Sequence, residues 1–408
     1  MLTSPIHIAL VAAEEWAGGV MYTHNLAKAL SMLPAAERPH MTLLYERDAR
    51  RFEALKNIVN ASIAYQPMFV QRRNRLESLL ANHGWRLSQW VLGERSFRLA
   101  MAAWRAGAVI TFPVFGAAHR LVPGPIAWIP DFQHRGMPHL FSSAEIRGRD
   151  RRFAAILKHP EQQVIFSSQH AQNDAKRYFG HVAAQQHLLR FATVPEPNWV
   201  DDPAPIVAKY QLPARYLIVC NQFWAHKGHA TLFEALHQLA QAGQPMHLVC
   251  TGPTQDYRNP TYFPSLQAKL REWGIESLVH TVGMIPRYDQ IMLMRGASAI
   301  MQPSVFEGWS TVLEDARALG QRVIATDFPV HLEQDLPGAL YFRAGDVADC
   351  VHAIRQHFDT EPAWQRQRAA FSSDAHHQRL LAFARAFMAI AVESQEARSK
   401  KQEPRTKN

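Results

Sequence analysis

The stretch PSVFEGWSTVLEDARALG, residues 303–320, decides the fold. It follows SAIMQPS, an apolar run that predicts a buried strand, and its second half has the apolar spacing of a helix. A strand-to-helix passage through Glu307 and Gly308 presents backbone N–H groups at the start of the helix, where they can bind an anion. The stretch therefore predicts an α/β protein with a ligand at the carboxyl edge of a parallel sheet.

Alternating strand and helix patterns extend outward from this stretch in both directions. Between RYLIVCNQF and QRVIATD they predict a doubly wound sheet over residues 215–360. The first half repeats the pattern from IHIALVAA to QQVIFSS, which predicts a second sheet over residues 1–195. A proline-rich segment, 196–214, is interpreted as a linker, residues 361–393 as terminal helices and 394–408 as a disordered basic tail. The fold class is therefore α/β with two Rossmann-like domains in tandem.

Two acidic residues of the stretch, Glu307 and Asp315, have seven residues between them. Both side chains can then face one ligand at the start of the helix, where a phosphate is the expected ligand group. A carboxylate would repel a phosphate, so its place here needs a reason. A ligand that also carries a sugar supplies one, because carboxylates accept hydrogen bonds from sugar hydroxyls. The alternative is an ordinary charge at a helix start together with a solvated helix acid.

The segment PSVFEGWSTVLED, with its flanks over roughly residues 215–350, resembles the carboxyl-terminal signature of retaining glycosyltransferases of family 4. The resemblance implies the GT-B fold, in which two Rossmann-like domains have a donor-binding cleft between them. It implies that Glu307 holds hydroxyls of the donor sugar and that the position of Asp315 holds the nucleotide ribose. The family carries Glu at the second position, so this chain has a shorter acid there.

A second segment, NQFWAHKGHATL at residues 221–232, follows a predicted strand. Lys227 stands at a strand-to-helix turn beside a glycine, where its charge can neutralise a diphosphate leaving group. Members of the family usually carry Arg where this chain has Gln222, so His226 is a partial substitute. The donor-binding set implied by the resemblance comprises Gly18, Gly19, Asn221, Gln222, His226, Gly308, Trp309, Ser310, Thr311 and Asp315. The catalytic set comprises Glu307, Lys227, Asp131 and His134.

Two segments of the first half contribute residues to those sets. Gly18 and Gly19 are predicted in the turn after the first strand, where a glycine pair lets backbone amides approach a phosphate. The stretch WIPDFQHRGMPHLFS resembles the family loop that faces the donor sugar. Either Asp131 or His134 is then expected to bond the sugar or orient the acceptor, and a structural turn or cap is the alternative for each.

The composition of the chain indicates the class of protein and the cellular compartment. The chain has 408 residues, 47% of them apolar, and three cysteines, which favours a folded protein in a reducing compartment, the cytoplasm. Residues 1–200 hold 23 Lys and Arg against 14 Asp and Glu, and thus the whole net charge of +9.

One basic segment of this first half also carries tryptophans. Residues 71–105 mix arginines with Trp85, Trp90 and Trp104, which predicts peripheral contact with an anionic membrane at the inner face of the plasma membrane. A solvated amphipathic helix is the alternative.

The sequence thus predicts a retaining, metal-independent glycosyltransferase that needs no cofactor beyond its donor. The donor is a GDP- or UDP-linked hexose, and the acceptor is a glycan or lipid-linked glycan of bacterial surface polysaccharide or lipopolysaccharide. No HExxH or clustered ligand pattern indicates a metal. The alternatives are a GT-B-fold sugar-nucleotide epimerase or phosphorylase and, more distantly, a basic nucleic-acid-binding protein, although no nucleic-acid recognition module is present.

Overall fold

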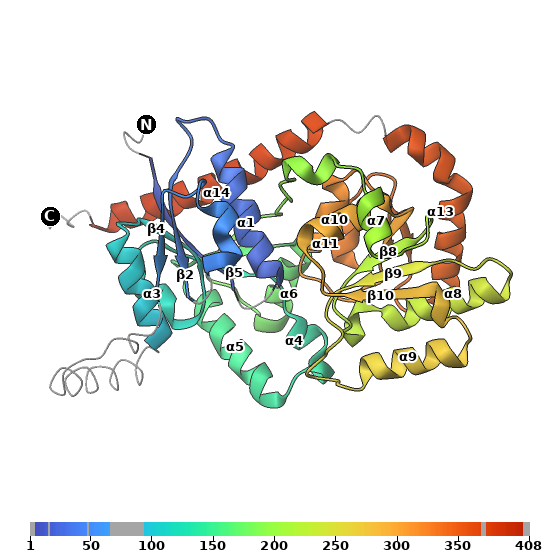
Figure 1. The fold of residues 1–408 in the computed structure, drawn as a ribbon. Helices are drawn as coiled ribbons and strands as arrows, with labels where there is room; N and C mark the ends of the chain where they lie inside the picture. The colour runs from blue at the N-terminus through green and yellow to red at the C-terminus, as the bar shows by residue number, and fades with distance from the viewer. Residues whose placement is uncertain (1–4, 15–16, 47–48, 66–93, 369–372, 403–408) are drawn as a thin grey trace, which may run out of the picture. The chain divides into compact units, whose positions relative to one another are not determined.

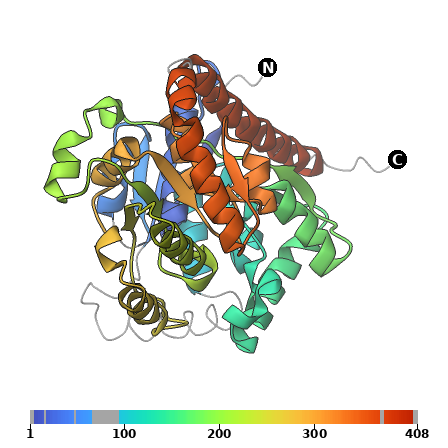
Figure 2. The same cartoon turned by 90° about the vertical axis from the view of Figure 1, so that its right-hand side faces the viewer.

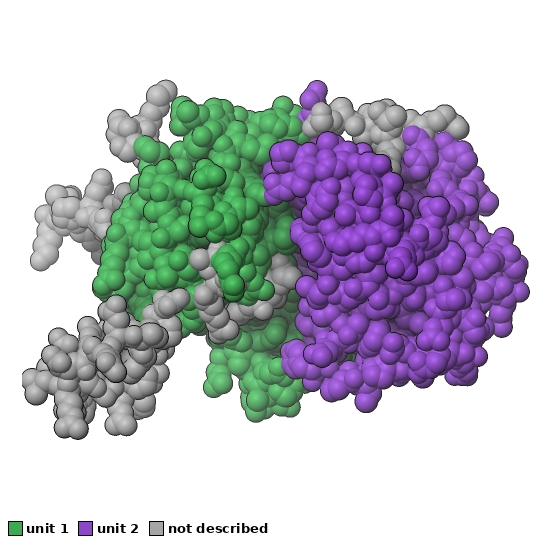
Figure 3. Space-filling view, viewed as in Figure 1, with its two compact units in different colours: residues 1–192, 377–408 green, residues 193–376 purple. Residues whose placement is uncertain are grey.

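Two parallel sheets organise the chain, one in each of its two units (Figures 1 and 3). The computed structural model describes residues 5–14, 17–46, 49–65, 94–368 and 373–402. Unit 1 comprises residues 1–192 and 377–408, and unit 2 comprises residues 193–376. The predicted α/β class with two helix-covered parallel sheets is confirmed.

The sheet of unit 1 has seven parallel strands in the order β3-β2-β1-β4-β5-β6-β7. Its central strands are apolar on both faces, because helices cover both. The strands are β1 His7–Val11, β2 His40–Tyr45, β3 Ala61–Ala64, β4 Ile110–Val114, β5 Pro125–Ile129, β6 Gln163–Phe166 and β7 Gln185–Leu188. Among the described residues of this unit, the α-helices of more than four residues are α1 Ala17–Ser31, α3 Glu94–Arg105, α5 Ser143–Leu157, α6 Gln169–Phe179 and α14 Ser373–Gln402.

The last helix, α14, completes the core of unit 1. The ring of Phe387 lies 5.0 Å from that of Phe112 in β4, and the ring of Phe383 lies 6.4 Å from that of Tyr22 in α1. All four side chains are buried. Figures 1 and 2 show α14 as a long helix that runs along this unit. The end of the chain therefore belongs to the same core as its beginning.

The sheet of unit 2 has six parallel strands in the order β10-β9-β8-β11-β12-β13. The chain moves outward from β8 in one direction and then returns to continue from β11 in the other. The strands are β8 Leu217–Cys220, β9 Leu248–Thr251, β10 Val279–Gly283, β11 Ala299–Gln302, β12 Val323–Thr326 and β13 Leu340–Phe342. The helices are α7 Ala204–Lys209, α8 His229–Gln241, α9 Tyr262–Glu272, α10 Arg287–Gly296, α11 Thr311–Ala318, α12 Pro329–Gln334 and α13 Val347–Arg368.

Both faces of this second sheet are covered. Along β8, Leu217 and Val219 pack with α8, α9 and α13, whereas Ile218 and Cys220 pack with α10 and α11. This alternation explains why the strand is an unbroken apolar run in the sequence. Ligands of such sheets bind where the strand order reverses, which here is the carboxyl end of the neighbouring strands β8 and β11.

Two predicted boundary segments differ from the structure. The expected linker, 196–214, contains a short helix at Pro197–Val200 and α7, and Trp199 is buried in the core of unit 2. The expected disordered tail, 394–408, contains the end of α14, which continues to Gln402. A proline lies in the first turn of both short helices of the linker, where its fixed backbone angle suits the helix.

Candidate functional site

The loops that follow β8 and β11 are held against each other. Gly228 adopts a left-handed backbone angle, φ 73°, and a Cβ at this position would lie 2.0 Å from the carbonyl oxygen of Pro303. The Val305 N–H also donates to the His226 carbonyl at 2.9 Å. Only glycine permits this close approach, so the two loops predicted to bind the donor form one surface.

Lys227 and Glu307 form an ion pair on that surface. The Lys227 ammonium, Nζ, donates to Glu307 Oε1 at 2.7 Å. Their side chains are 15% and 11% exposed, so the pair is largely shielded but reachable from solvent. The structure thus brings together the two residues that the sequence placed at the centre of the site.

Amide side chains fix the orientation of the Glu307 carboxylate. Gln302, the last residue of β11, donates from Nε2 to Glu307 Oε1 at 3.0 Å and to Ser310 Oγ at 2.9 Å. Asn221, the first residue after β8, donates from Nδ2 to Gln302 Oε1 at 2.7 Å. Gln302 and Asn221 are buried, which makes their bonds costly to lose. Asn221 therefore orients the site indirectly, through Gln302.

The charges at this site are balanced. Burial opposes ionisation of Glu307, but the Lys227 charge and the hydrogen bond from Lys227 outweigh it and lower the pKa of that carboxyl. Burial, followed by the Lys227 charge, lowers the pKa of His226 to about 3. Burial also lowers the pKa of His331 to about 4, although Glu307 acts in the opposite direction. At neutral pH, both imidazoles are therefore neutral, and Glu307 and Lys227 cancel each other's charge.

The start of α11 carries the remaining donor-binding residues of this loop. Ser310 caps the helix by accepting from the Leu313 N–H, and its own N–H donates to Gln334 Oε1 at 3.1 Å. The Ser310 amide is therefore already engaged. The N–H groups of Gly308 and Thr311 donate no hydrogen bond within the described residues, and Trp309 is buried beside them. Two helix-start donors thus remain for an anion.

Asp315, the residue expected to hold the ribose, already has two partners. Its Oδ1 accepts from Thr193 Oγ1 at 3.0 Å and lies 2.6 Å from Arg287 Nη2. Only 2% of its side chain is exposed, against 33% for Arg287. Arg287 also donates from Nη1 to Gln290 at 2.8 Å. The side chain that reaches solvent at this place is therefore the arginine.

Two further predicted residues lie near the pair. Gln222 is half-buried in the loop after β8, and its carbonyl oxygen accepts from the Trp224 N–H at 2.8 Å. His226 is buried in the same loop, where Lys227 is its neighbour in sequence. Because His226 carries no charge at neutral pH, it is a poor replacement for an arginine.

Asp131 and His134 occupy different environments in unit 1. His134 is fully buried, and its Nε2 lies 3.1 Å from Asp150 Oδ1. Asp131 is half-buried at the end of β5, and its Oδ1 accepts from the Gln133 N–H at 2.8 Å. Of the two residues, Asp131 is therefore the one that a ligand can reach.

Gly18 and Gly19 lie within the first turn of α1, which begins at Ala17. The sequence predicted them in the turn before the helix, so the helix starts earlier than expected. The Gly19 carbonyl accepts from the side-chain hydroxyl Thr23 Oγ1 at 3.0 Å. The two glycines still lie at a helix start after β1, which is the place required for anion binding.

The predicted membrane segment, 71–105, lies mostly outside the described residues. Its described part is α3, on which Phe97, Met101 and Trp104 are 47%, 39% and 55% exposed. Their spacing of four and three residues places them on one face of the helix. Trp85 and Trp90 lie outside the part of the chain that the structure describes.

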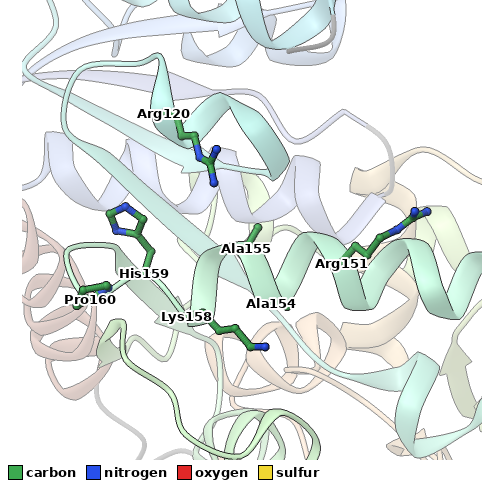
Figure 4. A pocket seen from close by; sticks show the side chains of 7 residues that line it. All are labelled: Arg120, Arg151, Ala154, Ala155, Lys158, His159 and Pro160. Atoms are coloured by element: carbon green, nitrogen blue, oxygen red, sulfur yellow. The ribbon is translucent and has the colours of Figure 1, made fainter. Parts of the chain in front are cut away.

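Unit 1 also has a surface pocket of about 420 Å³ (Figure 4). Its lining combines basic and small apolar side chains, namely Arg120, Arg151, Ala154, Ala155, Lys158, His159 and Pro160. In Figure 4, Arg151 and Lys158 extend in different directions from α5, so the basic groups do not converge on one point. We therefore do not place the donor site there.

Within the described ranges, no group of three or more His, Cys, Asp or Glu side chains is arranged to hold a metal ion. Of the helices that the structure describes, none has the length and apolar character to cross a membrane.

Sequence reasoning missed Gln302, Arg287 and Thr193. Gln302 and Arg287 lie at or just beyond the carboxyl ends of β11 and β10, where ligand-binding residues of parallel sheets gather. That position is a usable signal, since both residues are polar at the end of an apolar run. Thr193 meets Asp315 across 122 residues of sequence, and no local pattern indicates such a contact.

Comparisons with known proteins agree with this geometry. Residues 214–360 match the family model of glycosyl transferases group 1. A search of proteins with curated functions found no match. The matched residues include both loops of the Lys227–Glu307 pair.

Solved structures resemble almost the whole chain. A glycosyltransferase from Rickettsia africae ESF-5 is 14% identical with a TM-score of 0.65, and the alignment covers 98% of this chain and 100% of that one. Anabaena Alr3699/HepE, solved with UDP and with UDP-glucose, is 15% identical with a TM-score of 0.57 and coverages of 97% and 99%. WaaG, a glycosyltransferase involved in lipopolysaccharide biosynthesis, is 13% identical with a TM-score of 0.58 and coverages of 95% and 98%.

The class of protein follows from these findings. The two units have the α/β architecture of GT-B glycosyltransferases. The family match over unit 2 and this fold together indicate that the chain is a glycosyltransferase.

Proposed function

We propose that the chain is a retaining glycosyltransferase of the family 4 type that moves a hexose from a nucleoside-diphosphate sugar to a glycan or lipid-linked acceptor. The single observation that carries the proposal is the Lys227–Glu307 ion pair, Nζ to Oε1 2.7 Å, at the carboxyl ends of β8 and β11. Lys227 is the natural ligand of a diphosphate, and Glu307 that of sugar hydroxyls. No divalent metal is part of the proposal.

Donor binding would exchange the partners of this pair. The diphosphate accepts hydrogen bonds from the Lys227 ammonium and from the N–H groups of Gly308 and Thr311. In unit 1, Gly18 and Gly19 are candidate donor-binding residues. Glu307, released from Lys227, accepts from the sugar hydroxyls while Gln302 keeps holding its Oε1. In the donor-free site burial opposes ionisation of Glu307, but the charge of Lys227 lowers the pKa of this carboxyl, so Glu307 is ionised when the donor arrives. Each charged group thus has a partner before and after binding.

The transfer step then needs little from side chains. The bond from the sugar C1 to the diphosphate oxygen breaks, and the acceptor hydroxyl oxygen bonds to C1 on the same face. The acceptor proton passes to the leaving phosphate, so no enzymatic base is required. Lys227 and the helix-start amides stabilise the charge on the leaving group.

A uridine nucleotide is the favoured donor nucleotide in this proposal, and a guanosine nucleotide is the alternative. The support is that Anabaena HepE, which has the same fold, was solved with UDP and with UDP-glucose. Asp315 and Arg287 are the two candidate ribose ligands, and Arg287 is the more exposed of the two.

Unit 1 is the proposed acceptor side, and Asp131 is its candidate for orienting the acceptor hydroxyl. A role in surface polysaccharide or lipopolysaccharide assembly is supported by the likeness to WaaG, a glycosyltransferase involved in lipopolysaccharide biosynthesis. Peripheral contact with the cytoplasmic face of an anionic membrane is supported by the net charge of residues 1–200 and by the exposed face of α3.

A thermal-shift panel tests the proposed donor directly. We expect UDP and a UDP-hexose to stabilise the protein more than GDP, ADP and their sugars. Failure of every nucleotide in the panel to stabilise the chain would contradict the proposal. Product analysis then separates transfer to an acceptor from the alternatives, since an epimerase returns an isomeric sugar nucleotide and a phosphorylase requires inorganic phosphate.

A further inference from the structure

The proposed donor site lacks net positive charge. Lys227 is neutralised by Glu307 at 2.7 Å, and His226 and His331 are neutral at pH 7 because burial lowers their pKa values to about 3 and 4. A nucleoside diphosphate carries several negative charges, and an uncompensated charge in a shielded site is costly. The following inference rests on the proposed function. If a diphosphate binds here, the site needs a second cation.

The loop that follows β9 packs directly against the Lys227 loop. Gly252 has a φ of 120°, and a Cβ there would lie 2.4 Å from the carbonyl oxygen of Asn221. The Phe223 N–H donates to the Pro253 carbonyl at 3.0 Å. Because β9 is the neighbour of β8 in the sheet, both loops lie at the same carboxyl edge (Figure 1). A charged residue of this loop is therefore within the region that a diphosphate would occupy.

Arg258 is that residue. Its guanidinium carbon lies 4.4 Å from the ring centroid of Trp224, whose ring is 5.7 Å from that of His226. The Trp224 carbonyl accepts from the Lys227 N–H at 2.8 Å, so one short segment links the two cations. The Arg258 side chain is 10% exposed, and stacking on the ring holds its planar group in place.

Asp256 orients Arg258. Asp256 Oδ1 accepts from the backbone N–H of Arg258 at 2.9 Å, whereas the Arg258 Nε lies 3.5 Å from the same oxygen. The longer contact is a weak ion pair. Burial and the Lys227 charge lower the pKa of His226, Glu307 opposes them, and the charge of Arg258 adds to the lowering, which is consistent with its nearness to the site.

We propose that Arg258 is the second diphosphate-binding cation of the donor site, contributed by the loop after β9 and held on the face of Trp224. Lys227 and Arg258 then bind the diphosphate from two adjacent loops. A planar guanidinium suits this task, because it can bond two phosphate oxygens at once.

Calorimetric titration of the full-length protein with UDP, UMP, uridine and inorganic pyrophosphate tests the proposal. We expect Arg258→Gln to lower the affinity for UDP and pyrophosphate by about tenfold or more, as a lost charge-assisted bond would. Affinity for uridine should stay unchanged, and Arg258→Lys should restore part of the UDP affinity. Arg271→Gln, at an exposed arginine of α9, is the matched control and should leave all four affinities unchanged.

Two outcomes would overturn the proposal. One is an unchanged UDP affinity in Arg258→Gln. The other is an equal loss for uridine and UDP, accompanied by a lower melting temperature, which would mean that Arg258 only supports the loop through Trp224. Failure of the proposed function looks different, since the wild-type protein would then bind none of the nucleotides.

Discussion

Lys227 Nζ lies 2.7 Å from Glu307 Oε1, and this pair joins the loop after β8 to the loop after β11. Both side chains are mostly shielded, so each depends on the other for its charge balance. A ligand that engages one must offer something to the other. A sugar diphosphate does this, because it has an anionic part for the lysine and hydroxyls for the carboxylate.

Glu307→Gln keeps the size of the side chain but removes the charge that would hold sugar hydroxyls. We expect transfer to fall about 10²-fold, a loss of about 2.7 kcal/mol in transition-state stabilisation, while affinity for UDP is nearly kept. Steady-state turnover and calorimetry measure the two quantities. Glu272→Gln, at an exposed position of α9, is the control, and near-normal turnover in Glu307→Gln would contradict the assignment.

Lys227→Ala should weaken diphosphate binding as well as the rate. The variant also leaves the shielded Glu307 carboxylate without its cation, which repels an incoming phosphate. We expect a loss of UDP affinity of about tenfold or more, measured by calorimetry. Lys269→Ala, an exposed lysine of α9, serves as control. If Lys227→Ala bound free UDP as tightly as the wild type, the lysine would lie outside the site.

The Arg287–Asp315 contact predicts a test of stability and of ribose recognition. Arg287→Met leaves the buried Asp315 with Thr193 as its remaining partner at Oδ1, so we expect a loss of about 1–3 kcal/mol in the free energy of unfolding. In Arg287→Met/Asp315→Asn, the combined loss should be smaller than the sum of the single losses. Urea denaturation measures these values.

The same variants also show which residue contacts the nucleoside. If Asp315 bonds the ribose, Asp315→Asn should lower affinity for UDP more than affinity for 2′-deoxy-UDP. If Arg287 alone meets the ligand, Asp315→Asn should reduce both affinities alike. The side-chain exposures of 33% and 2% favour the second result.

His229 makes the stability of unit 2 depend on pH. Burial, followed by the Lys227 charge, lowers its pKa to about 3, whereas an unfolded histidine has a pKa of about 6.5. The unfolded state therefore binds a proton first, and stability is lost as the pH falls from about 6.5 toward 3, by up to about 1.4 kcal/mol per pH unit. His229→Leu should lose less melting temperature between pH 7 and pH 5 than the wild type.

The reason for choosing this histidine is its environment. Its ring stacks on Phe223 at 4.2 Å, and neither ring nitrogen has a hydrogen-bond partner within the described residues. Leucine can therefore replace it without breaking a bond. Equal pH dependence in the two proteins, measured by calorimetric melting, would show that His229 is not the titrating group.

The exposed face of α3 predicts binding to anionic vesicles. Phe97→Ser/Met101→Ser should lower binding to phosphatidylglycerol vesicles several-fold, because it removes apolar side chains that can enter the membrane interface. Binding of the wild type should weaken as salt is raised, since the Debye length shrinks to about 10 Å at 0.1 M. Val200→Ser, at an exposed apolar residue of unit 2, should change nothing. A wild type that ignores such vesicles at low salt would refute the contact.

The fold was predictable from the sequence because both sheets are buried on both faces. Strands such as Leu217–Cys220 are unbroken apolar runs, and turns and helices separate them at regular distances. The segment 196–214 was harder, because its prolines suggest a linker although Trp199 anchors it in a core. When residues distant in the sequence bury a single side chain, the local sequence pattern does not indicate it.

The site was predictable where one short segment carries it. Lys227 and Glu307 each lie just after a strand of the same sheet, so their meeting follows from the topology. The partners of Asp315 were not predictable, since Thr193 and Arg287 come from other elements and reach it only in the folded chain. The burial of His134 also depends on α5, which supplies Asp150.

The place of α14 has a consequence for the order in which the chain is made. Ribosomes synthesise the strands of unit 1 first, yet Phe383 and Phe387, which pack on Tyr22 and Phe112, emerge only after residue 376, where unit 2 ends. All of unit 2 is translated in between. The nascent first unit therefore holds an incomplete aromatic core until all of unit 2 has been translated, while unit 2 has all its strands available before that core is complete. A chain truncated before Phe383 would lack these two aromatic side chains in the core of unit 1, although the sequence of unit 2 would be intact.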